Sequence, residues 1–459
     1  MFGRSHSRPW FSLLPLVGLL LAGFVGCAAG GPSPRANTAA AGATRAAPTP
    51  PPAAQASNPA TPQRAYPVML GIDVLEANRF EQLRGKRVGL LTHPAGVNRR
   101  GESTVDVLRR APGVNLVALF GPEHGIYGDE KANVPVDDRI DPRTGLPVFS
   151  LYGKYRKPTP KMLEGLDALV VDLQDIGTRS YTYVSCMRLA MTACFEQGVE
   201  FIVLDRPNPL GGLKVDGPPL DAQWKSYVGA FRVPYVHGLT IAELARMSRF
   251  APGVLDLDDA TRNAGKLTIV PMRGWTRAMR WPETGLKWVP TSPMIPDFAA
   301  VVGYPMVGLG TYLGDFSHGV GVDYPFRGIA HRGTRIDQLE SLLRAMNVPG
   351  IAVQRVRATT REGKPTEGLY LRVADWAQWN PVEMNFHLMR LACALEPTNP
   401  FADAKDSEAG LFIKHMGSEA FFNAIKRDGA DIDLDHWLAT WRRQADIYQR
   451  QSQRYWIYR

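Results

Sequence analysis

The feature that most constrains the fold is a series of short, almost wholly apolar segments that alternate with helical patterns from residue 69 onward. Four such segments are expected to be strands, at residues 87–92, 114–120, 166–173 and 199–205. Strands that helices cover on both faces have this pattern, whereas half-exposed strands alternate apolar and polar side chains. Helices are expected at residues 103–110 and 181–197. The sequence therefore predicts an α/β fold with a Rossmann-like parallel sheet.

The polar loops that follow these strands predict where a ligand binds. Loops rich in Gly, Pro and polar side chains lie at residues 92–96, 121–125, 172–179 and 205–212. In an open parallel sheet such loops meet at the carboxyl edge, where ligands bind. Turn closure and helix capping explain any single loop better, but four coincident loops favour a site.

Length and charge limit the classes to which the chain can belong. With 459 residues the chain is longer than those that usually fold around a single hydrophobic core, so two subdomains are expected. The net charge is +9, but residues 1–72 hold five Arg and no acidic residue, which leaves only +4 for the remaining 387 residues. No basic segment with interleaved aromatic residues occurs, so nucleic acid is not an expected partner.

The N-terminus has the pattern of an export signal. Arg4 and Arg8 precede an apolar run at residues 10–25, which at about 16 residues is short for a transmembrane helix. Residues 24–27 resemble a bacterial lipobox that ends at Cys27, although simple signal cleavage is the alternative. We expect residues 1–27 to be a lipoprotein signal peptide with Cys27 lipidated, and the protein to be exported and to face the periplasm from the outer membrane.

Residues 28–66 are expected to be a linker. They hold 14 Ala and 8 Pro among 39 positions, with almost no large apolar side chain to bury. The folded part is therefore expected to begin at about residue 67, some distance from its membrane anchor.

Motifs that are missing from the chain exclude several common chemistries. It has no GxGxxG after the first strand, and no GxxxxGK[ST], HExxH or GxSxG. Dinucleotide, P-loop, zinc-protease and serine-hydrolase sites thus lose their usual support. We expect no cofactor and no metal, and acid–base chemistry by carboxylates is the leading option.

Glu123 is the leading candidate for a proton donor. It stands in the motif GPEHG at residues 121–125, where a stiff turn would present it at the sheet edge, and His124 is expected to orient it. Asp172, Asp175 or Asp205 would supply the second carboxylate that glycosidic cleavage ordinarily needs. Of these we favour Asp175 as the catalytic group. The alternative is that Glu123 only caps a helix or forms a salt bridge.

Further polar residues of these loops are expected to bind substrate. Arg179 and Arg206 offer planar donors for a carboxylate, and Asn208 can bond an amide or hydroxyl group. A buried pair of Asp205 with Arg206 is an equally good interpretation. The other expected substrate-binding residues are His93, Asp172, Gln174, Tyr181, Asp205 and His237.

Long motifs around these loops resemble one family. The motifs are GPEHG at 121–125, PVFSLYG at 147–153, DLQDIGTRSYTY at 172–183 and LDRPNPLGG at 204–212, and they resemble the exo-β-N-acetylmuramidase family of the NamZ type. The resemblance runs from about residue 71 to the C-terminus, where RYWIY occupies residues 454–458.

This resemblance implies a fold, a reaction and one catalytic residue. It implies a Rossmann-like subdomain followed by a C-terminal α/β subdomain, here placed at residues 67–240 and 241–459, with the active site in the cleft between them. It also implies release of N-acetylmuramic acid from the non-reducing ends of peptidoglycan fragments during cell-wall turnover or recycling, and it matches Glu123 to the family's catalytic glutamate.

The chain departs from the family pattern at residues 317–326. His318 and Val320 stand where the family usually has Glu and Arg, and residues 292–296 lack a common Asn. We expect His318 to bind substrate, and either a changed sugar preference or a loss of activity.

Two other functions remain open at this point. One is a non-catalytic envelope lipoprotein that binds muropeptides or glycans, and the other is a metal-dependent amidase that uses His93, His124 and His237. The presence of Glu123, Asp172 and Asp175 together favours the glycoside hydrolase. Because the sequence does not give the separation of the carboxyl groups, retaining, inverting and substrate-assisted mechanisms all stay open.

Overall fold

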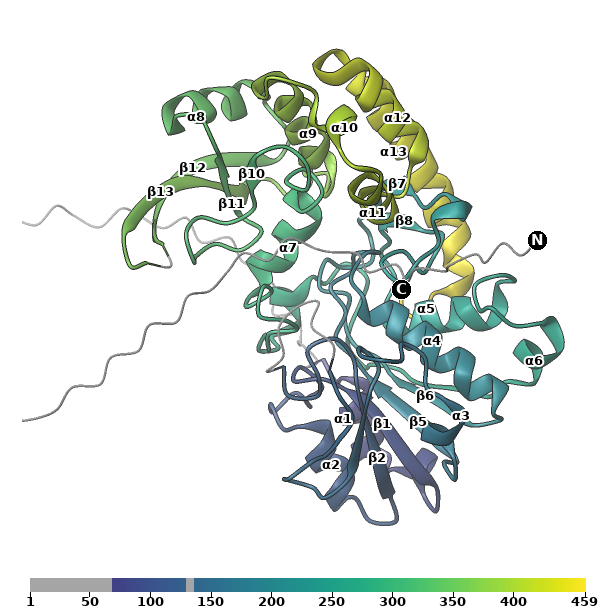
Figure 1. Cartoon of the computed structure of the whole chain (residues 1–459). Helices are drawn as coiled ribbons and strands as arrows, with labels where there is room; N and C mark the ends of the chain where they lie inside the picture. The colour runs from purple at the N-terminus through teal and green to yellow at the C-terminus, as the bar shows by residue number, and fades with distance from the viewer. Residues whose placement is uncertain (1–67, 129–135, 361) are drawn as a thin grey trace, which may run out of the picture. The chain divides into compact units, whose positions relative to one another are not determined.

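A seven-stranded sheet organises the first part of the protein, in the order β3-β4-β2-β1-β5-β6-β9. Its strands are β1 Arg87–Thr92, β2 Asn115–Gly121, β3 Arg139–Ile140, β4 Pro147–Ser150, β5 Ala168–Asp172, β6 Glu200–Leu204 and β9 Leu267–Val270. All neighbours pair in parallel except β3, which is antiparallel to β4. Figure 1 shows β1 between β2 and β5, with β6 beyond β5. The predicted Rossmann-like sheet is confirmed, and all four predicted strands are present.

The computed structural model describes residues 68–128, 136–360 and 362–459. The predicted signal peptide, Cys27 and the predicted linker lie outside these residues. Within them, no helix is both long enough and apolar enough to cross a membrane.

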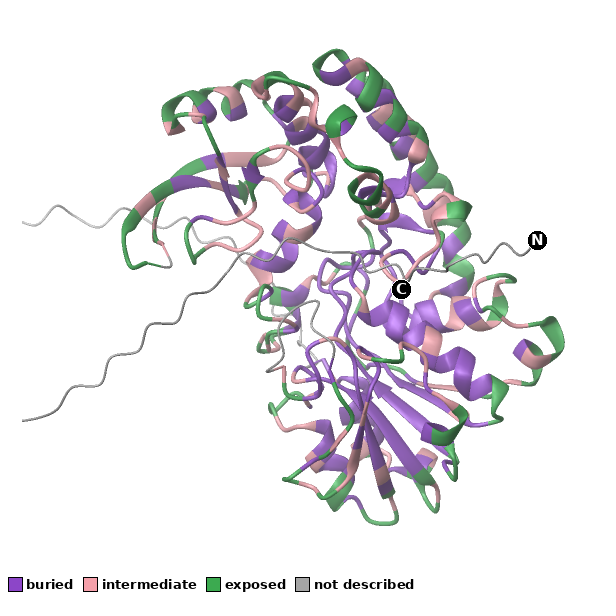
Figure 2. Ribbon diagram, in the orientation of Figure 1, coloured by how far each residue is buried: buried purple, intermediate pink, exposed green. Residues whose placement is uncertain are grey.

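Helices cover both faces of the sheet, which explains why its strands are apolar throughout. On one face, Val88 and Leu90 pack with α1 (Gly71–Ala77) and α2 (Thr104–Arg110). On the other face, Leu91 belongs to the cluster that contains α4 (Tyr183–Glu196) and α5 (Ile241–Phe250). Figure 2 shows these strands almost entirely buried. Short helices α3 (Pro160–Leu163) and α6 (Asp259–Ala264) complete this part.

A smaller sheet and a group of helices form the second part. The sheet has the order β10-β11-β13-β12 and comprises β10 Phe316–Ser317, β11 Gly328–His331, β12 Ile351–Thr359 and β13 Pro365–Val373. The helices are α7 Phe298–Val307, α8 Ile336–Ala345, α9 Glu383–Leu395, α10 Pro400–Asp403, α11 Asp406–Met416, α12 Glu419–Asp428 and α13 Leu434–Ser452. One apolar cluster joins α7, α8 and α9 to the sheet, and a second joins α9 to α13.

The two parts are connected by more than the chain between them. A two-stranded ribbon of β7 (Asp216–Pro219) and β8 (Pro234–Val236) packs against α13, and Tyr458 near the C-terminus donates a hydrogen bond to Asp205. The last strand of the first sheet, β9, pairs with β6 but follows the expected boundary at residues 240/241 in the sequence. That boundary therefore separates β9 from the other strands of its sheet.

Candidate active site

A pocket of about 590 Å³ lies at the carboxyl edge of the first sheet, lined by residues from both parts of the protein. From the loops after β2, β4 and β5 come Glu123, His124, Tyr152, Ser180, Tyr181, Thr182 and Tyr183. Tyr227, Val228, Ser292, Pro293, Met294, Ile295, Tyr304, Phe326 and His415 complete its wall. Both parts thus contribute to one pocket, as a cleft between two subdomains requires.

Glu123 reaches this pocket from the turn after β2. The turn closes with a hydrogen bond from the Gly125 amide to the Pro122 carbonyl, and His124 has φ of 71°, a left-handed conformation uncommon outside glycine. The Glu123 carboxylate accepts a hydrogen bond of 2.9 Å from the Thr182 hydroxyl, directly before α4. Glu123 is half-buried on the pocket wall, so its carboxylate is both oriented and able to meet a substrate.

Phenols surround Glu123. Burial and then the Glu123 carboxylate raise the pKa of Tyr152, so this phenol stays neutral and can donate a hydrogen bond. The Arg156 guanidinium lies over the Tyr152 ring, 3.4 Å from its centroid. Burial also raises the pKa of Tyr304 to about 12, and the charges of Glu123 and Asp175 add to this rise. Tyr304 therefore lies near both carboxylates.

Asp175 is buried and does not line the pocket. One carboxylate oxygen, Oδ2, accepts the Gly177 amide at 2.7 Å, while Oδ1 is buried without a hydrogen-bond partner among the described residues. Burial raises the pKa of Asp175 to about 7. Its charge also raises the pKa of Tyr181, a pocket residue, so Asp175 lies close behind the wall.

His237 is a buried neighbour of Asp175. Its Nε2 lies 3.7 Å from Asp175 Oδ2, and its Nδ1 accepts the Leu239 amide at 3.2 Å. Burial lowers the pKa of His237 to about 3, so the ring is neutral and its single proton is on Nε2, toward Asp175. The pair forms an internal contact away from the pocket wall.

Asp172, Asp205, Arg206 and Asn208 are held by internal partners. Arg206 binds both oxygens of Asp172, at 2.6 and 2.8 Å, and both side chains are buried. Asp205 accepts hydrogen bonds from Tyr458 at 2.6 Å and Thr240 at 2.8 Å, and Asn208 donates to the Leu239 carbonyl. The interpretation of Arg206 as half of a buried ion pair is correct, but its partner is Asp172 rather than Asp205.

Arg179 is also occupied by the protein itself. Its two Nη groups donate to four backbone carbonyls, those of Pro218, Val233, His415 and Met416. The expectation that Arg179 binds a substrate carboxylate is corrected accordingly, because this buried guanidinium holds α11 to the ribbon of β7 and β8.

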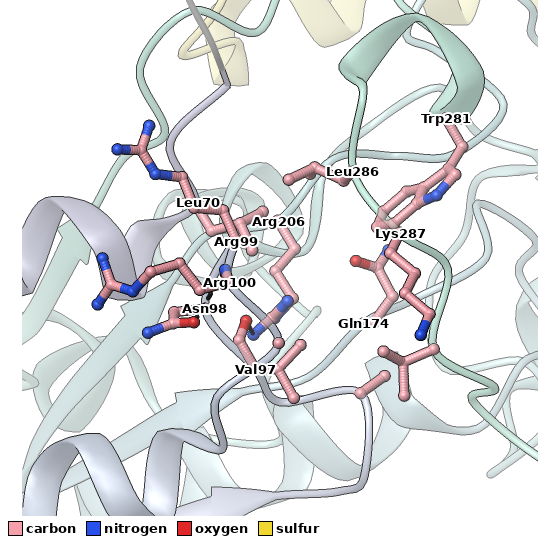
Figure 3. Close-up of a pocket in the computed structure, with 13 residues that line it drawn as sticks. Leu70, Val97, Asn98, Arg99, Arg100, Gln174, Arg206, Trp281, Leu286 and Lys287 are labelled. Atoms are coloured by element: carbon pink, nitrogen blue, oxygen red, sulfur yellow. Dashed lines mark hydrogen bonds between the residues drawn. The ribbon is translucent and has the colours of Figure 1, made fainter.

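His93 and Gln174 form another internal contact. The backbone N–H of Gln174 donates to His93 Nε2 at 2.9 Å, and the His93 ring meets Tyr183 edge-on. Gln174 and Arg206 line a second, small pocket of about 90 Å³, and Figure 3 shows the guanidinium groups of Arg99 and Arg100 directed away from it. These two guanidinium groups therefore do not point into this small pocket.

Tyr181 lies where the sequence placed it, on the wall of the main pocket, and its hydroxyl donates to Thr291 at 2.7 Å. His318 lies at a neighbouring pocket, described below. Among the described residues, no group of three or more His, Cys, Asp or Glu is placed to hold a metal ion. His93, His124 and His237 thus do not form the ligand set that the amidase alternative needs.

Sequence reasoning did not select several residues of the wall, notably Tyr152, Tyr227, Tyr304, Phe326 and His415. Tyr152 belongs to the PVFSLYG motif, which contains β4 and continues into the loop after it. This motif could have identified Tyr152 as a residue of the site. Phe326 ends the segment at residues 317–326 that the sequence had marked, whereas Tyr227, Tyr304 and His415 reach the pocket through tertiary packing and no local pattern marks them.

Two family models together span this architecture. The N-terminal model of the exo-β-N-acetylmuramidase NamZ matches residues 88–299, and its C-terminal model matches residues 302–458. The chain belongs to this family. It is 36% identical over 399 residues to the peptidoglycan β-N-acetylmuramidase NamZ of Bacillus subtilis, covering 85% of this chain and 91% of that protein. The predicted family and the predicted glycoside hydrolase class are confirmed.

Solved structures of relatives share the fold. A DUF1343 family protein of Bacteroides fragilis superposes with a TM-score of 0.77 at 38% identity, covering 86% of this chain and all of that one. A second DUF1343 protein of the same species has a TM-score of 0.65 at 27% identity, covering 85% and 99%. The α/β architecture of this NamZ family member is thus that of its relatives.

Proposed function

We propose that this NamZ family member releases N-acetylmuramic acid from the non-reducing ends of peptidoglycan fragments. The observation that carries the proposal is a half-buried glutamate, Glu123, on the wall of a pocket of about 590 Å³ that both parts of the protein line. The activity named for the Bacillus subtilis relative supports the same substrate class.

Glu123 is proposed to protonate the glycosidic oxygen. Its carboxylate faces the pocket, and the Thr182 hydroxyl fixes one of its oxygens. Asp175 is the proposed second carboxyl group, and because it does not line the pocket it would act through its charge, from behind Tyr181 and Tyr304. With a pKa of about 7, Asp175 is divided between its neutral and charged forms near neutral pH.

The test of this function compares two chromogenic substrates, an N-acetylmuramide and the matching N-acetylglucosaminide. We expect hydrolysis of the muramide, at a higher kcat/KM than the glucosaminide. Binding of both sugars without hydrolysis would instead support the non-catalytic glycan-binding alternative. Equal hydrolysis would mean that the altered segment at 317–326 has relaxed the sugar preference.

We further propose that the protein acts in cell-wall turnover as an exported lipoprotein, attached through Cys27 to the outer membrane and facing the periplasm. Support comes from the apolar run that ends at Cys27 and the Ala/Pro-rich segment after it. Cys27→Ala should move the protein from the membrane to the soluble fraction, whereas the control Cys393→Ala should not. Recovery of processed Cys27→Ala with the membrane would contradict the anchor.

A further inference from the structure

A second pocket adjoins the one that holds Glu123. It measures about 810 Å³ and shares Pro293 and Met294 with the first pocket. Ser317, His318 and Val322 also line it. The two pockets thus adjoin at Pro293 and Met294.

A stacked ring pair forms the boundary between them. The His318 imidazole stacks on the Phe326 ring, with centroids 4.3 Å apart and an angle of 6° between the planes. Phe326 lines the first pocket, and its ring centroid lies 4.9 Å from that of Tyr304. His318 lines the second pocket. Burial lowers the pKa of His318, so the ring stacks in its neutral form at neutral pH. Aromatic surface therefore continues from one pocket into the next.

The backbone of this loop is held in an unusual conformation. Tyr324 and Phe326 have φ of 54° and 57°, in the left-handed region that bulky residues rarely adopt. Gly303 in α7 lets the backbone at Phe326 approach the helix closely, because a Cβ there would lie 2.1 Å from the Phe326 carbonyl oxygen. The packing of α7 against this loop therefore positions the backbone that carries the Phe326 ring.

Val320 packs against β11 and β13, next to this loop. Its side chain is 2% exposed and covers Gly328 and Gly368, where added Cβ atoms would meet it within 2.5 Å. Val320 does not line the second pocket. Of the two departures at residues 317–326, only His318 therefore lines this pocket.

The chemistry of this second pocket suits a sugar ring. Its wall offers exposed apolar side chains, with Met294 44% and Val322 58% exposed, beside the Ser317 hydroxyl and the Arg327 side chain. A pyranose has C–H faces that pack on apolar and aromatic surface, and hydroxyl edges that need a few polar partners. Exposed apolar side chains gathered at a cavity indicate a binding surface.

We propose that this pocket binds the sugar on the reducing side of the bond that is cleaved, an N-acetylhexosamine, and that His318 helps to determine how well it is accepted. The inference rests on the proposed function. The leaving sugar is joined to the oxygen that Glu123 protonates, so it must occupy space next to the Glu123 pocket. The second pocket, which shares Pro293 and Met294 with the first, lies in that place.

The test uses two substrates with the same muramic acid ring. One is the disaccharide of N-acetylmuramic acid linked to N-acetylglucosamine, and the other is N-acetylmuramyl fluoride, whose leaving group is a single atom. In His318→Ala, the ratio of kcat/KM for the disaccharide to that for the fluoride should fall about tenfold, mainly through KM of the disaccharide. The control is His436→Ala, an exposed histidine on α13.

Val322→Glu is a second variant that does not disturb the ring stack, because this exposed side chain lies at the same pocket. It should lower the same ratio. An unchanged ratio in both variants, with melting temperatures near that of the wild type, would overturn the proposed sugar site while leaving the muramidase function intact. Wild-type protein that hydrolyses neither substrate would overturn both.

Discussion

The carboxylates at the edge of the main sheet fall into two groups that the sequence alone makes look alike. Asp172 and Asp205 are fully buried and bonded to Arg206, Tyr458 and Thr240. Glu123 is half-buried, with the Thr182 hydroxyl on one oxygen and a pocket before it. A polar loop after a strand therefore serves either to hold the fold or to meet a ligand, and the partners of each carboxylate decide which.

The largest expected effect is on the Glu123 side of this comparison. Glu123→Gln keeps the shape but removes the titratable proton, so kcat/KM for the natural disaccharide should fall by about 10² to 10⁴. The loss should be smaller for a nitrophenyl glycoside, which needs less protonation of its leaving group. Steady-state kinetics on both substrates measure this.

The control is Glu164→Gln at an exposed position, which should keep its activity. If Glu123→Gln turned over the disaccharide at nearly the wild-type rate, Glu123 would belong with the structural carboxylates.

On the structural side, Arg206→Met should cost stability. It leaves the buried Asp172 carboxylate without its bidentate partner, and breaking such a pair costs about 3 to 5 kcal/mol of unfolding free energy. The exposed Arg99→Met should change stability by less than about 0.5 kcal/mol. Urea unfolding of both variants gives the comparison, and similar stabilities for the two would show that the buried pair is not holding the loops.

Asp175 is buried like the structural carboxylates, but it lies close behind the pocket wall. The pH dependence of the unfolding free energy measures its contribution to stability. Burial holds its pKa at about 7 in the folded protein, above the ordinary value of about 3.9, so the folded state binds the proton more tightly. Its contribution to stability is therefore complete below about pH 4 and is lost as pH rises through 7, by at most about 4 kcal/mol.

Asp175→Asn removes this titration. The unfolding free energy of the variant, relative to wild type, should rise between pH 5 and pH 8, as denaturant unfolding at each pH will measure. A constant difference across this range would mean that Asp175 titrates normally.

The smallest expected effect distinguishes two tyrosines that share one partner. Tyr304 and Tyr235 both contact the Ser180 hydroxyl, at 3.2 and 2.9 Å, but only Tyr304 lines the pocket. Tyr304→Phe and Tyr235→Phe should each lose about 1 kcal/mol of stability. Only Tyr304→Phe should also lower kcat/KM, by about tenfold. Equal activity losses in the two variants would show that Tyr304 acts through packing alone.

The sheet was predictable because its strands carry their signal locally. Near-continuous apolar runs such as β1 require two covered faces, and polar loops after parallel strands meet at one edge. This logic and the GPEHG motif together placed Glu123 at that edge.

The partners of the other polar residues were not predictable, because they come from distant parts of the chain. Arg179 meets the His415 and Met416 carbonyls 236 and 237 residues away, and Asp205 meets Tyr458 at a separation of 253. No local pattern reports such contacts, so loops that hold the fold and loops that face the pocket looked the same.

Identification of the products formed from peptidoglycan fragments with N-acetylmuramic acid at the non-reducing end tests the central claim most directly. The purified protein should release free N-acetylmuramic acid from that end, as mass spectrometry would detect, and Glu123→Gln should release almost none. Internal cleavage into oligosaccharides, or no release by the wild-type protein, would contradict the proposed exo-acting muramidase.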